Sequence, residues 1–133
     1  MTLLTIICAL CITISGPARV IDGDTLKIGD TKIRLNGIDA AELNTDLGQI
    51  ARDALIEIID SRPLTCALTG RKTWDRQVGY CVTPDGQDIA QRLIADGFAL
   101  ACPRYDRRYL RFEQPQTVAE QPRAPYCVLR SRP

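Results

Sequence analysis

The 133-residue chain contains no histidine. Imidazole is the side chain that proteins most often use as a general base near neutral pH, and it is a common ligand of transition metals. Reactions that depend on imidazole as base, nucleophile or metal ligand are therefore excluded. Acid–base chemistry in this chain has to use carboxylates, tyrosine, lysine, cysteine or bound water.

A cysteine-rich zinc or redox motif is also lacking. The only pair with CxxC spacing is Cys8 and Cys11, and it lies in an apolar N-terminal run. That setting is not typical of a metal or redox site, so we discount the pair. Any metal site in the chain is expected to use oxygen ligands.

The apolar run at residues 3–10 is too short to span a bilayer as a helix. It has the character of a signal peptide, with small residues Ala9 and Cys11 at the positions that precede cleavage. We predict a signal peptide in residues 1–11 and a secreted or periplasmic bacterial protein, membrane-associated if the segment is retained. No lysine or arginine precedes the run, so a buried first strand at residues 3–14 stays open as an alternative.

Composition places the chain among soluble single-domain proteins, with 45% hydrophobic and 25% charged residues. The net charge is +1, but it is distributed unevenly. Residues 104–133 carry seven arginines against Asp106, Glu113 and Glu120. A basic end suits a polyanionic partner, although a solvated arginine-rich tail explains it equally well.

Signal cleavage after residue 11 leaves four cysteines, an even number that indicates disulfides in a small exported domain. Cys66 and Cys81 lie in two apolar runs that suit neighbouring strands, while Cys102 and Cys127 flank the last segment. We predict the pairings 66–81 and 102–127, each adding roughly 3 kcal/mol by restricting the unfolded chain. The alternative is buried free thiols in a cytoplasmic protein.

Strand patterns dominate the first part of the chain. Residues 12–21 are rich in β-branched residues, with a break at Gly16-Pro17. Residues 26–28 and 32–35 alternate apolar with polar side chains and are joined by Gly29-Asp30, which predicts a hairpin. Apolar residues at helical spacing then predict an amphipathic helix over residues 47–59 with Asp46 as its cap.

Shorter elements follow this helix. Residues 63–68 and 78–82 are strand candidates, and a short helix from Ile89 is expected to end at Gly97. Prolines beyond Cys102 argue against a long terminal helix but allow a short one over residues 107–113. The order predicts a β-rich α+β domain, with a five-stranded OB-type barrel and two to three helices.

Four charged residues in a short stretch are hard to explain as folding devices. Asp24 opens a strand, Arg34 lies on the next strand, and Asp39 and Glu42 follow the end of that strand. Carboxylate oxygens suit Ca²⁺ or Mg²⁺, and a nearby arginine suits bidentate recognition of phosphate. The alternative is a common Asp-Gly-Asp turn beside a surface ion pair between Arg34 and Asp39.

The spacing of these residues resembles the two-part signature of the staphylococcal nuclease (thermonuclease) family. The resemblance covers about residues 14–109 and implies an OB-fold barrel that cleaves DNA and RNA to 3′-phosphates with Ca²⁺. It divides the chain into a nuclease domain at 12–112 and an extension at 113–133, in a protein expected to be a monomer. The signature segments are Val20-Ile21-Asp22-Gly23-Asp24-Thr25 and Ile33-Arg34-Leu35-Asn36-Gly37-Ile38-Asp39-Ala40-Ala41-Glu42.

By position, the resemblance assigns Asp24 and Asp39 as Ca²⁺ ligands, with a backbone carbonyl from Ala40. It assigns Glu42 as general base for the attacking water and Arg34 as a phosphate-binding arginine. The family proline before the glutamate is absent here, because residue 41 is alanine. This departure is expected to loosen the loop that carries Glu42.

A second phosphate-binding arginine is expected after the helix, in a family segment that reads Asp-Arg-Tyr-Gly-Arg. This chain has Lys72-Thr73-Trp74-Asp75-Arg76 there, which matches Arg76 and an aromatic position. Tyr105 matches a family tyrosine near the nucleotide base, and Trp74 is a second stacking candidate. A binding module without catalysis and a periplasmic metal- or partner-binding module are the alternatives.

Overall fold

The computed structural model describes residues 12–129, so the predicted signal peptide at residues 1–11 lies outside the described residues. Six strands form the main sheet, in the order β1-β6-β7-β4-β3-β2. Neighbouring strands are antiparallel except β4 and β7, which run parallel. The strands are β1 (Ile12–Gly16), β2 (Ala18–Asp22), β3 (Thr25–Ile28), β4 (Thr31–Leu35), β6 (Leu64–Thr73) and β7 (Arg76–Val82).

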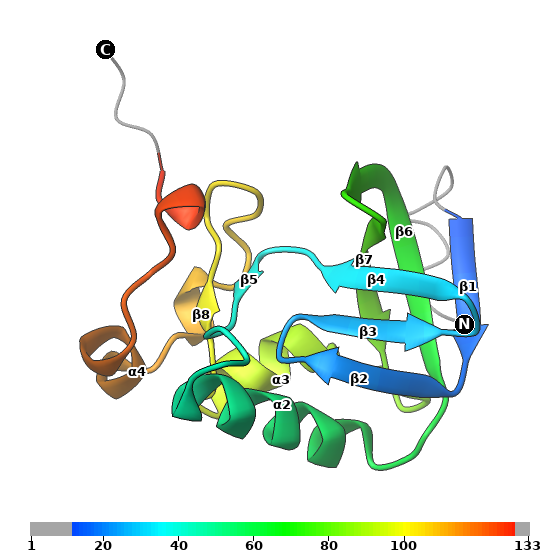
Figure 1. The fold of residues 1–133 in the computed structure, drawn as a ribbon, viewed down its shortest axis with the longest axis horizontal. Helices are drawn as coiled ribbons and strands as arrows, with labels where there is room; N and C mark the ends of the chain where they lie inside the picture. Colours follow the sequence, from blue (N-terminus) through cyan, green and yellow to red (C-terminus); the bar gives the residue numbers. More distant parts are fainter. Residues whose placement is uncertain (1–11, 130–133) are drawn as a thin grey trace.

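The sheet is strongly curled (Figure 1), because one stretch of chain supplies both of its edges. Only Pro17 separates β1 from β2, yet β1 pairs with β6 while β2 pairs with β3 at the other edge. The OB-like α+β prediction is confirmed. The strand count differs from five because the first strand bends at Gly16-Pro17 and is divided into two, as the proline lacks a backbone N–H.

In the described part of the chain, three α-helices accompany the sheet: α2 (Asp46–Ile59), α3 (Ile89–Ala95) and α4 (Pro115–Glu120). The predicted cap of α2 was wrong, since Thr45 occupies that position and its hydroxyl accepts a 3.1 Å hydrogen bond from the N–H of Gly48. Asp46 instead lies in the first turn, where its charge complements the helix dipole.

The helix expected over residues 107–113 is reduced to a 3₁₀ turn, η1 (Leu110–Phe112). Helix α4 is a short helix that the sequence does not predict, because the prolines beyond Cys102 argue against a long terminal helix and give no helical pattern there. A proline at the first helical position needs no N–H partner and has a suitable φ angle, so it begins α4 instead of preventing it.

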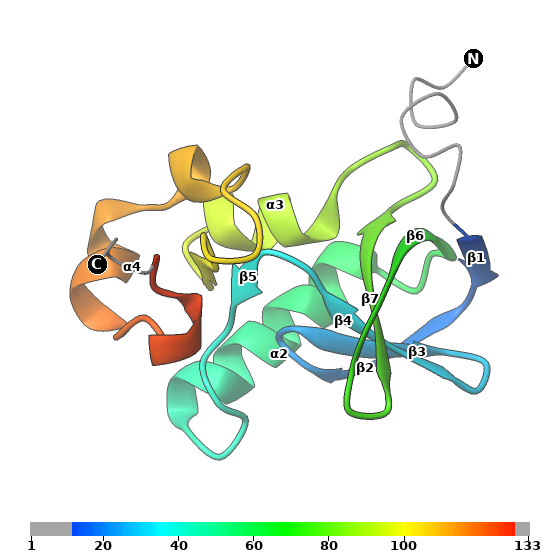
Figure 2. The same cartoon turned by 90° about the horizontal axis from the view of Figure 1, so that it is seen from above.

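The core lies between the concave sheet and the helices α2 and α3, which run side by side across the open end (Figures 1 and 2). Helix α2 buries one face, as its periodicity predicts, although Leu47 and Ile50 near its N-terminus are half-exposed. Its buried positions pack with those of α3 and of the sheet. The fully buried side chains include Leu26, Ile33, Leu35, Leu55, Ile89 and Leu93.

A separate two-stranded ribbon lies beside the barrel and is formed by β5 (Ile38–Asp39) and β8 (Leu100–Ala101). The chain after β8 passes through η1 and α4 and returns to this ribbon at the 3₁₀ turn η2 (Pro125–Cys127). The ribbon matters for function because Asp39 is its last residue on β5.

Both predicted disulfides are present. Cys66 and Cys81 face each other across β6 and β7, with their Cα atoms 4.0 Å apart. Cys102 and Cys127 join the end of β8 to η2, with Cα atoms 4.4 Å apart. Two buried disulfides indicate a protein that matures in an oxidising environment. Within residues 12–129, no helix has both the length and the apolar character needed to cross a membrane.

Candidate active site

The turn between β2 and β3 carries Asp24 and packs tightly against two other elements. A Cβ atom added at Gly23 would lie 2.8 Å from the Cβ of Ala40 and 2.9 Å from that of Ala51. Only glycine allows this approach, which brings the turn against the residue after β5 and against α2. The Asp24 N–H donates to the carboxylate of Asp22 across 3.1 Å and fixes the turn. The glycine of the motif therefore places Asp24 next to the end of β5.

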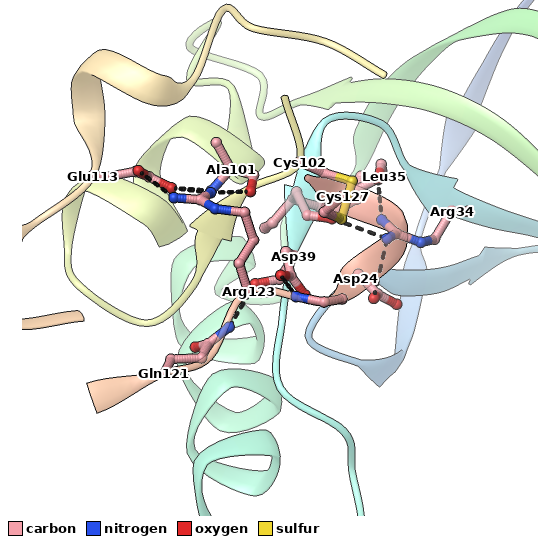
Figure 3. The surroundings of a disulfide bond; sticks show 12 residues. Asp24, Arg34, Leu35, Asp39, Ala101, Cys102, Glu113, Gln121, Arg123 and Cys127 are labelled. Carbon is pink, nitrogen blue, oxygen red and sulfur yellow. Dashed lines mark hydrogen bonds and ion pairs between the residues drawn. A yellow bond between two sulfur atoms is a disulfide. The ribbon is translucent and has the colours of Figure 1, made fainter. Parts of the chain in front are cut away.

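Two arginines from different strands approach the carboxylate of Asp24. Arg34 on β4 lies with its Nη2 atom 3.5 Å from Asp24 Oδ2, as Figure 3 shows. Arg76 at the start of β7 lies with its Nη1 atom 4.0 Å from Asp24 Oδ1 and donates to the Thr25 hydroxyl across 2.9 Å. The sheet order explains this convergence, because β4 lies between β3 and β7.

The guanidinium of Arg34 is held in place by main-chain acceptors. It donates to the carbonyl of Leu35 and, across 2.9 Å, to the carbonyl of Ile38. These bonds fix the guanidinium plane between β4 and the start of β5, while part of it stays accessible at the pocket. A pre-oriented guanidinium loses little freedom when it binds a phosphate oxygen.

Asp39 is almost completely buried, with 3% of its surface exposed. Its Oδ2 atom accepts a hydrogen bond from the Ala124 N–H across 2.7 Å, and its main-chain carbonyl accepts one from Gln121 Nε2 across 2.9 Å. Burial raises the pKa of Asp39, while the Ala124 N–H and the positive charges of Arg34 and Arg123 act in the opposite direction. Asp39 is thus a carboxylate that the fold desolvates and orients.

The pKa of Asp22 is raised to about 6, first by burial and then by its hydrogen bonding with Asp24 and that residue's charge. Asp24 also raises the pKa of Asp39, so negative charge accumulates at this point of the fold. A bound cation would offset that charge, and the donors are all hard oxygens, which is the chemistry Ca²⁺ prefers.

Asp24, Asp39 and the carbonyl of Ala40 are the candidate ligands that the sequence resemblance names. Residues 12–129 contain no group of three or more Asp, Glu, His or Cys side chains close enough to share a metal ion. Two carboxylates would have to be completed by carbonyl oxygens and water, which Ca²⁺ accepts readily. The oxygen donors present therefore fit a hard cation such as Ca²⁺.

Glu42 lies in an exposed loop whose backbone is fixed. Its carbonyl accepts hydrogen bonds from the N–H and the hydroxyl of Thr45, at 3.0 and 2.6 Å. A Cβ at Gly48 would lie 1.8 Å from that carbonyl oxygen, so the first turn of α2 packs directly on the loop. Within residues 12–129, the Glu42 carboxylate has no hydrogen bond or salt bridge, and the structure does not bring it to the two arginines.

A pocket of about 420 Å³ opens beside Arg34 and Arg76. Trp74 stands at its rim with 94% of its surface exposed, and Tyr105 is 44% exposed with the Arg71 guanidinium 4.8 Å from its ring centroid. Arginines and exposed aromatic rings around one hollow are typical of surfaces that bind single-stranded nucleic acid. The structure therefore brings the predicted residues Trp74 and Tyr105 into the same pocket as Arg34 and Arg76.

Three residues of this region were not predicted from the sequence. Thr25 and Arg71 lie next to predicted residues in the chain and gave no signal of their own. Tyr126 comes from the far end of the chain, lines the same pocket and lies close to Arg34. Burial raises the pKa of Tyr126, and Arg34 partly offsets this effect. Its position next to Cys127 was the one clue to its placement.

Comparison with known proteins identifies related sequences. Residues 32–124 match the family model described as "Staphylococcal nuclease homologue". The succinoglycan biosynthesis protein ExoI of Rhizobium meliloti is 36% identical over 98 residues, which are 65% of this chain and 51% of that protein. An uncharacterized endonuclease of Escherichia coli O157:H7 is 31% identical over 102 residues, 73% of this chain and 67% of that protein. The chain therefore spans about half the length of the first relative.

Proposed function

The chain belongs to the family of staphylococcal nuclease homologues, and we propose that it is a Ca²⁺-dependent nuclease that hydrolyses phosphodiester bonds of DNA, RNA or both. The observation that carries this proposal is the convergence of Arg34 and Arg76 on Asp24 at one end of a basic, aromatic pocket. A relative named an endonuclease supports the same reaction class.

In this mechanism the two arginines bind the scissile phosphate. Among the residues that the structure describes, Asp24 is the only carboxylate that both guanidinium groups approach, so they retain donors for phosphate oxygens. Their fixed positions favour the extra negative charge that develops as water attacks phosphorus. Ca²⁺, when bound by Asp24, Asp39 and the Ala40 carbonyl, supplies further charge stabilisation at the phosphate.

Glu42 is assigned as the group that accepts the proton of the attacking water. Attack forms a new phosphorus–oxygen bond, and the bond to the 5′-oxygen of the next nucleotide breaks. The products are a 3′-phosphate and a 5′-hydroxyl, whose proton comes from solvent. The loop that carries Glu42 has a fixed backbone and an exposed side chain. Such a side chain is accessible to a water molecule on the substrate, and it acquires its catalytic partner only when substrate binds.

The remaining residues of the pocket bind the nucleotides around the cleaved bond. Trp74 and Tyr105 offer ring faces to unstacked bases, which favours denatured DNA or RNA over intact duplex. The two disulfides support an exported protein that acts in an oxidising compartment. The proposal requires no partner protein, and we expect a monomer.

The decisive experiment is digestion of denatured DNA and of RNA by the oxidised protein, with Ca²⁺ and with EGTA. We expect cleavage with Ca²⁺ and its loss with EGTA. The Arg34→Ala/Arg76→Ala double variant, purified in parallel, controls for contaminating nucleases. Absence of Ca²⁺-dependent cleavage by the oxidised, folded protein would contradict the proposal.

A second candidate is a nucleic-acid-binding module that does not cleave. Glu42 does not line the pocket, whereas the aromatic residues Trp74 and Tyr105 line it and are exposed, an arrangement that a binding module would also have. Binding of single-stranded DNA by the unmodified protein with equal strength in Ca²⁺ and EGTA, without cleavage in either, would select this candidate.

A further inference from the structure

The segment of residues 121–127, here called the clamp, packs against Asp39 and the ribbon. Gln121 is buried and donates from Nε2 to the main-chain carbonyl of Asp39 across 2.9 Å. The Ala124 N–H donates to Asp39 Oδ2 across 2.7 Å. The clamp therefore binds both the backbone and the carboxylate of one residue, as Figure 3 shows for Gln121 and Asp39.

Arg123 anchors the middle of the clamp to the ribbon. Its guanidinium forms a bidentate ion pair with the Glu113 carboxylate at 2.6 and 3.0 Å and also donates to the carbonyl of Ala101 across 2.6 Å. The Glu113 carboxylate in turn accepts the Ala101 N–H across 2.7 Å. All of these groups are at least partly buried, which strengthens charge-assisted bonds relative to those at an exposed surface.

The Cys102–Cys127 disulfide closes the end of the clamp. Both sulfur-bearing residues are buried, and Cys102 also donates its N–H to the Gly37 carbonyl across 2.7 Å. The disulfide thus ties the clamp to the backbone that leads into β5 and Asp39. The neighbouring clamp residue, Tyr126, is held in the pocket beside Arg34.

We propose that the clamp is a positioning element for the cation site, which holds Asp39 in its ligating orientation and is kept closed by the Cys102–Cys127 disulfide. A hydrogen bond to one carboxylate oxygen leaves the other oxygen aimed in a defined direction. Partners of this kind, one step removed from a metal, typically change its affinity about 10- to 100-fold when they are lost. This inference rests on the proposed function, because it concerns the same carboxylate.

A single substitution breaks the hydrogen bond to the carboxylate and displaces Asp39 Oδ2, because the proline ring occupies the place of the amide hydrogen. Ala124 has a φ angle of −58°, which proline also adopts, so Ala124→Pro deletes the N–H donor without a forced change in the φ angle of that residue. Ala124→Gly keeps the N–H and is the matched comparison. Calcium binding by the oxidised full chain is measured by isothermal titration calorimetry, with Asp39→Asn as the reference for a lost ligand.

The disulfide is tested in the same assay with paired cysteine variants. Cys102→Ser/Cys127→Ser opens the clamp, whereas Cys66→Ser/Cys81→Ser removes the disulfide between β6 and β7. Circular dichroism and urea unfolding establish that each variant is folded at the assay temperature. If the Cys102→Ser/Cys127→Ser variant does not fold, Ala124→Pro still tests the clamp.

We expect the Kd for Ca²⁺ to rise about 10- to 100-fold in Ala124→Pro and in Cys102→Ser/Cys127→Ser, with little change in the two control variants. Equal affinity for Ca²⁺ in Ala124→Pro and Ala124→Gly overturns the positioning role of the clamp, while the proposed function stands. Unchanged affinity after loss of the 102–127 disulfide overturns its closing role. Absence of Ca²⁺ binding by the unmodified protein overturns the cation site and the clamp together.

Discussion

The guanidinium of Arg76 donates a 2.9 Å hydrogen bond to the hydroxyl of Thr25 and thereby joins β7 to the turn that carries Asp24. These two residues are 51 positions apart in the chain. The contact depends on β4 lying between β3 and β7, since a different sheet order would separate the two side chains. It places Arg76, the arginine whose motif was least complete in the sequence, beside Asp24 in the proposed site.

Replacement of Arg76 is therefore expected to impair cleavage strongly. We expect Arg76→Ala to lower kcat/KM about 100-fold, because a fixed donor to the charged phosphate is lost. Arg76→Lys should recover only part of the rate, since an ammonium group cannot donate to Thr25 and to phosphate with the same geometry. Initial rates on denatured DNA at saturating Ca²⁺ measure both effects.

The double variant Arg34→Ala/Arg76→Ala provides a check on this interpretation. Because both arginines act on one phosphate, the combined loss should be smaller than the product of the single losses. Activity of Arg76→Ala within threefold of the unmodified protein would exclude this residue from the site.

Glu42 is the assigned base, and its role is open to a direct test. We expect Glu42→Gln to lower kcat about 100-fold or more with little change in KM, because the amide has the same shape but cannot accept a proton. Glu57→Gln, at an exposed position on α2, is the matched control and should leave the rate unchanged. Near-normal turnover by Glu42→Gln would reject the assignment and favour the binding module.

The acidic cluster predicts an unusual pH dependence of stability in the metal-free protein. The folded-state pKa of Asp22 is about 6, above its ordinary value of 3.8. The folded state therefore binds this proton more tightly than the unfolded state does. The contribution of Asp22 to stability falls as pH rises from about 4 to about 6 and stays low above that range.

Asp22→Asn should remove this penalty, since the amide oxygen still accepts the Asp24 N–H. We expect the variant in EGTA to gain roughly 1–2 kcal/mol at pH 7 and little at pH 4, a value reduced for solvent screening. Urea unfolding at the two pH values measures the difference. Asp75→Asn is a control of opposite sign, because Lys32 lowers the pKa of Asp75 and that stabilisation is lost as pH falls. An equal effect of Asp22→Asn at both pH values would contradict the prediction.

Local patterns were sufficient to predict the helix at α2, the central hairpin and both disulfide pairings. Each of these depends on residue periodicity, turn chemistry or cysteine spacing, which are readable in one stretch of chain. The hydrogen bond that orients the Asp39 carboxylate was not predictable in this way. It uses the backbone N–H of Ala124, 85 residues away, and a backbone atom carries no signature in the sequence.

The position of Tyr126 was missed for the same physical reason. Its placement depends on how the chain between Cys102 and Cys127 folds, and prolines there gave no periodic pattern to follow. Pro115 and Pro125 instead begin α4 and η2 and turn the chain back to the ribbon. The charged residues of the motif could be named from the sequence, whereas the elements that orient them required the tertiary structure.

Substitution of Trp74 allows the effect on substrate binding to be measured separately from the effect on stability. Its side chain is 94% exposed, and its backbone has a φ angle of 57°, a conformation that favours glycine. Trp74→Gly should therefore leave the stability unchanged or slightly raise it, while it removes a ring on which a base can stack. Stacking on an aromatic side chain is worth about 1–3 kcal/mol per base, which corresponds to a roughly 5- to 150-fold weaker affinity for single-stranded DNA.

The test uses the fact that this is the single tryptophan of the chain. Quenching of its fluorescence by an oligodeoxynucleotide in EGTA reports the affinity of the unmodified protein without cleavage. Fluorescence anisotropy of a labelled oligonucleotide then compares it with Trp74→Gly and with Trp74→Phe, which keeps an aromatic face. We expect Trp74→Phe to retain most of the affinity. Equal binding by the glycine variant would show that the exposed ring stacks on no base, and that the bases contact other parts of the pocket.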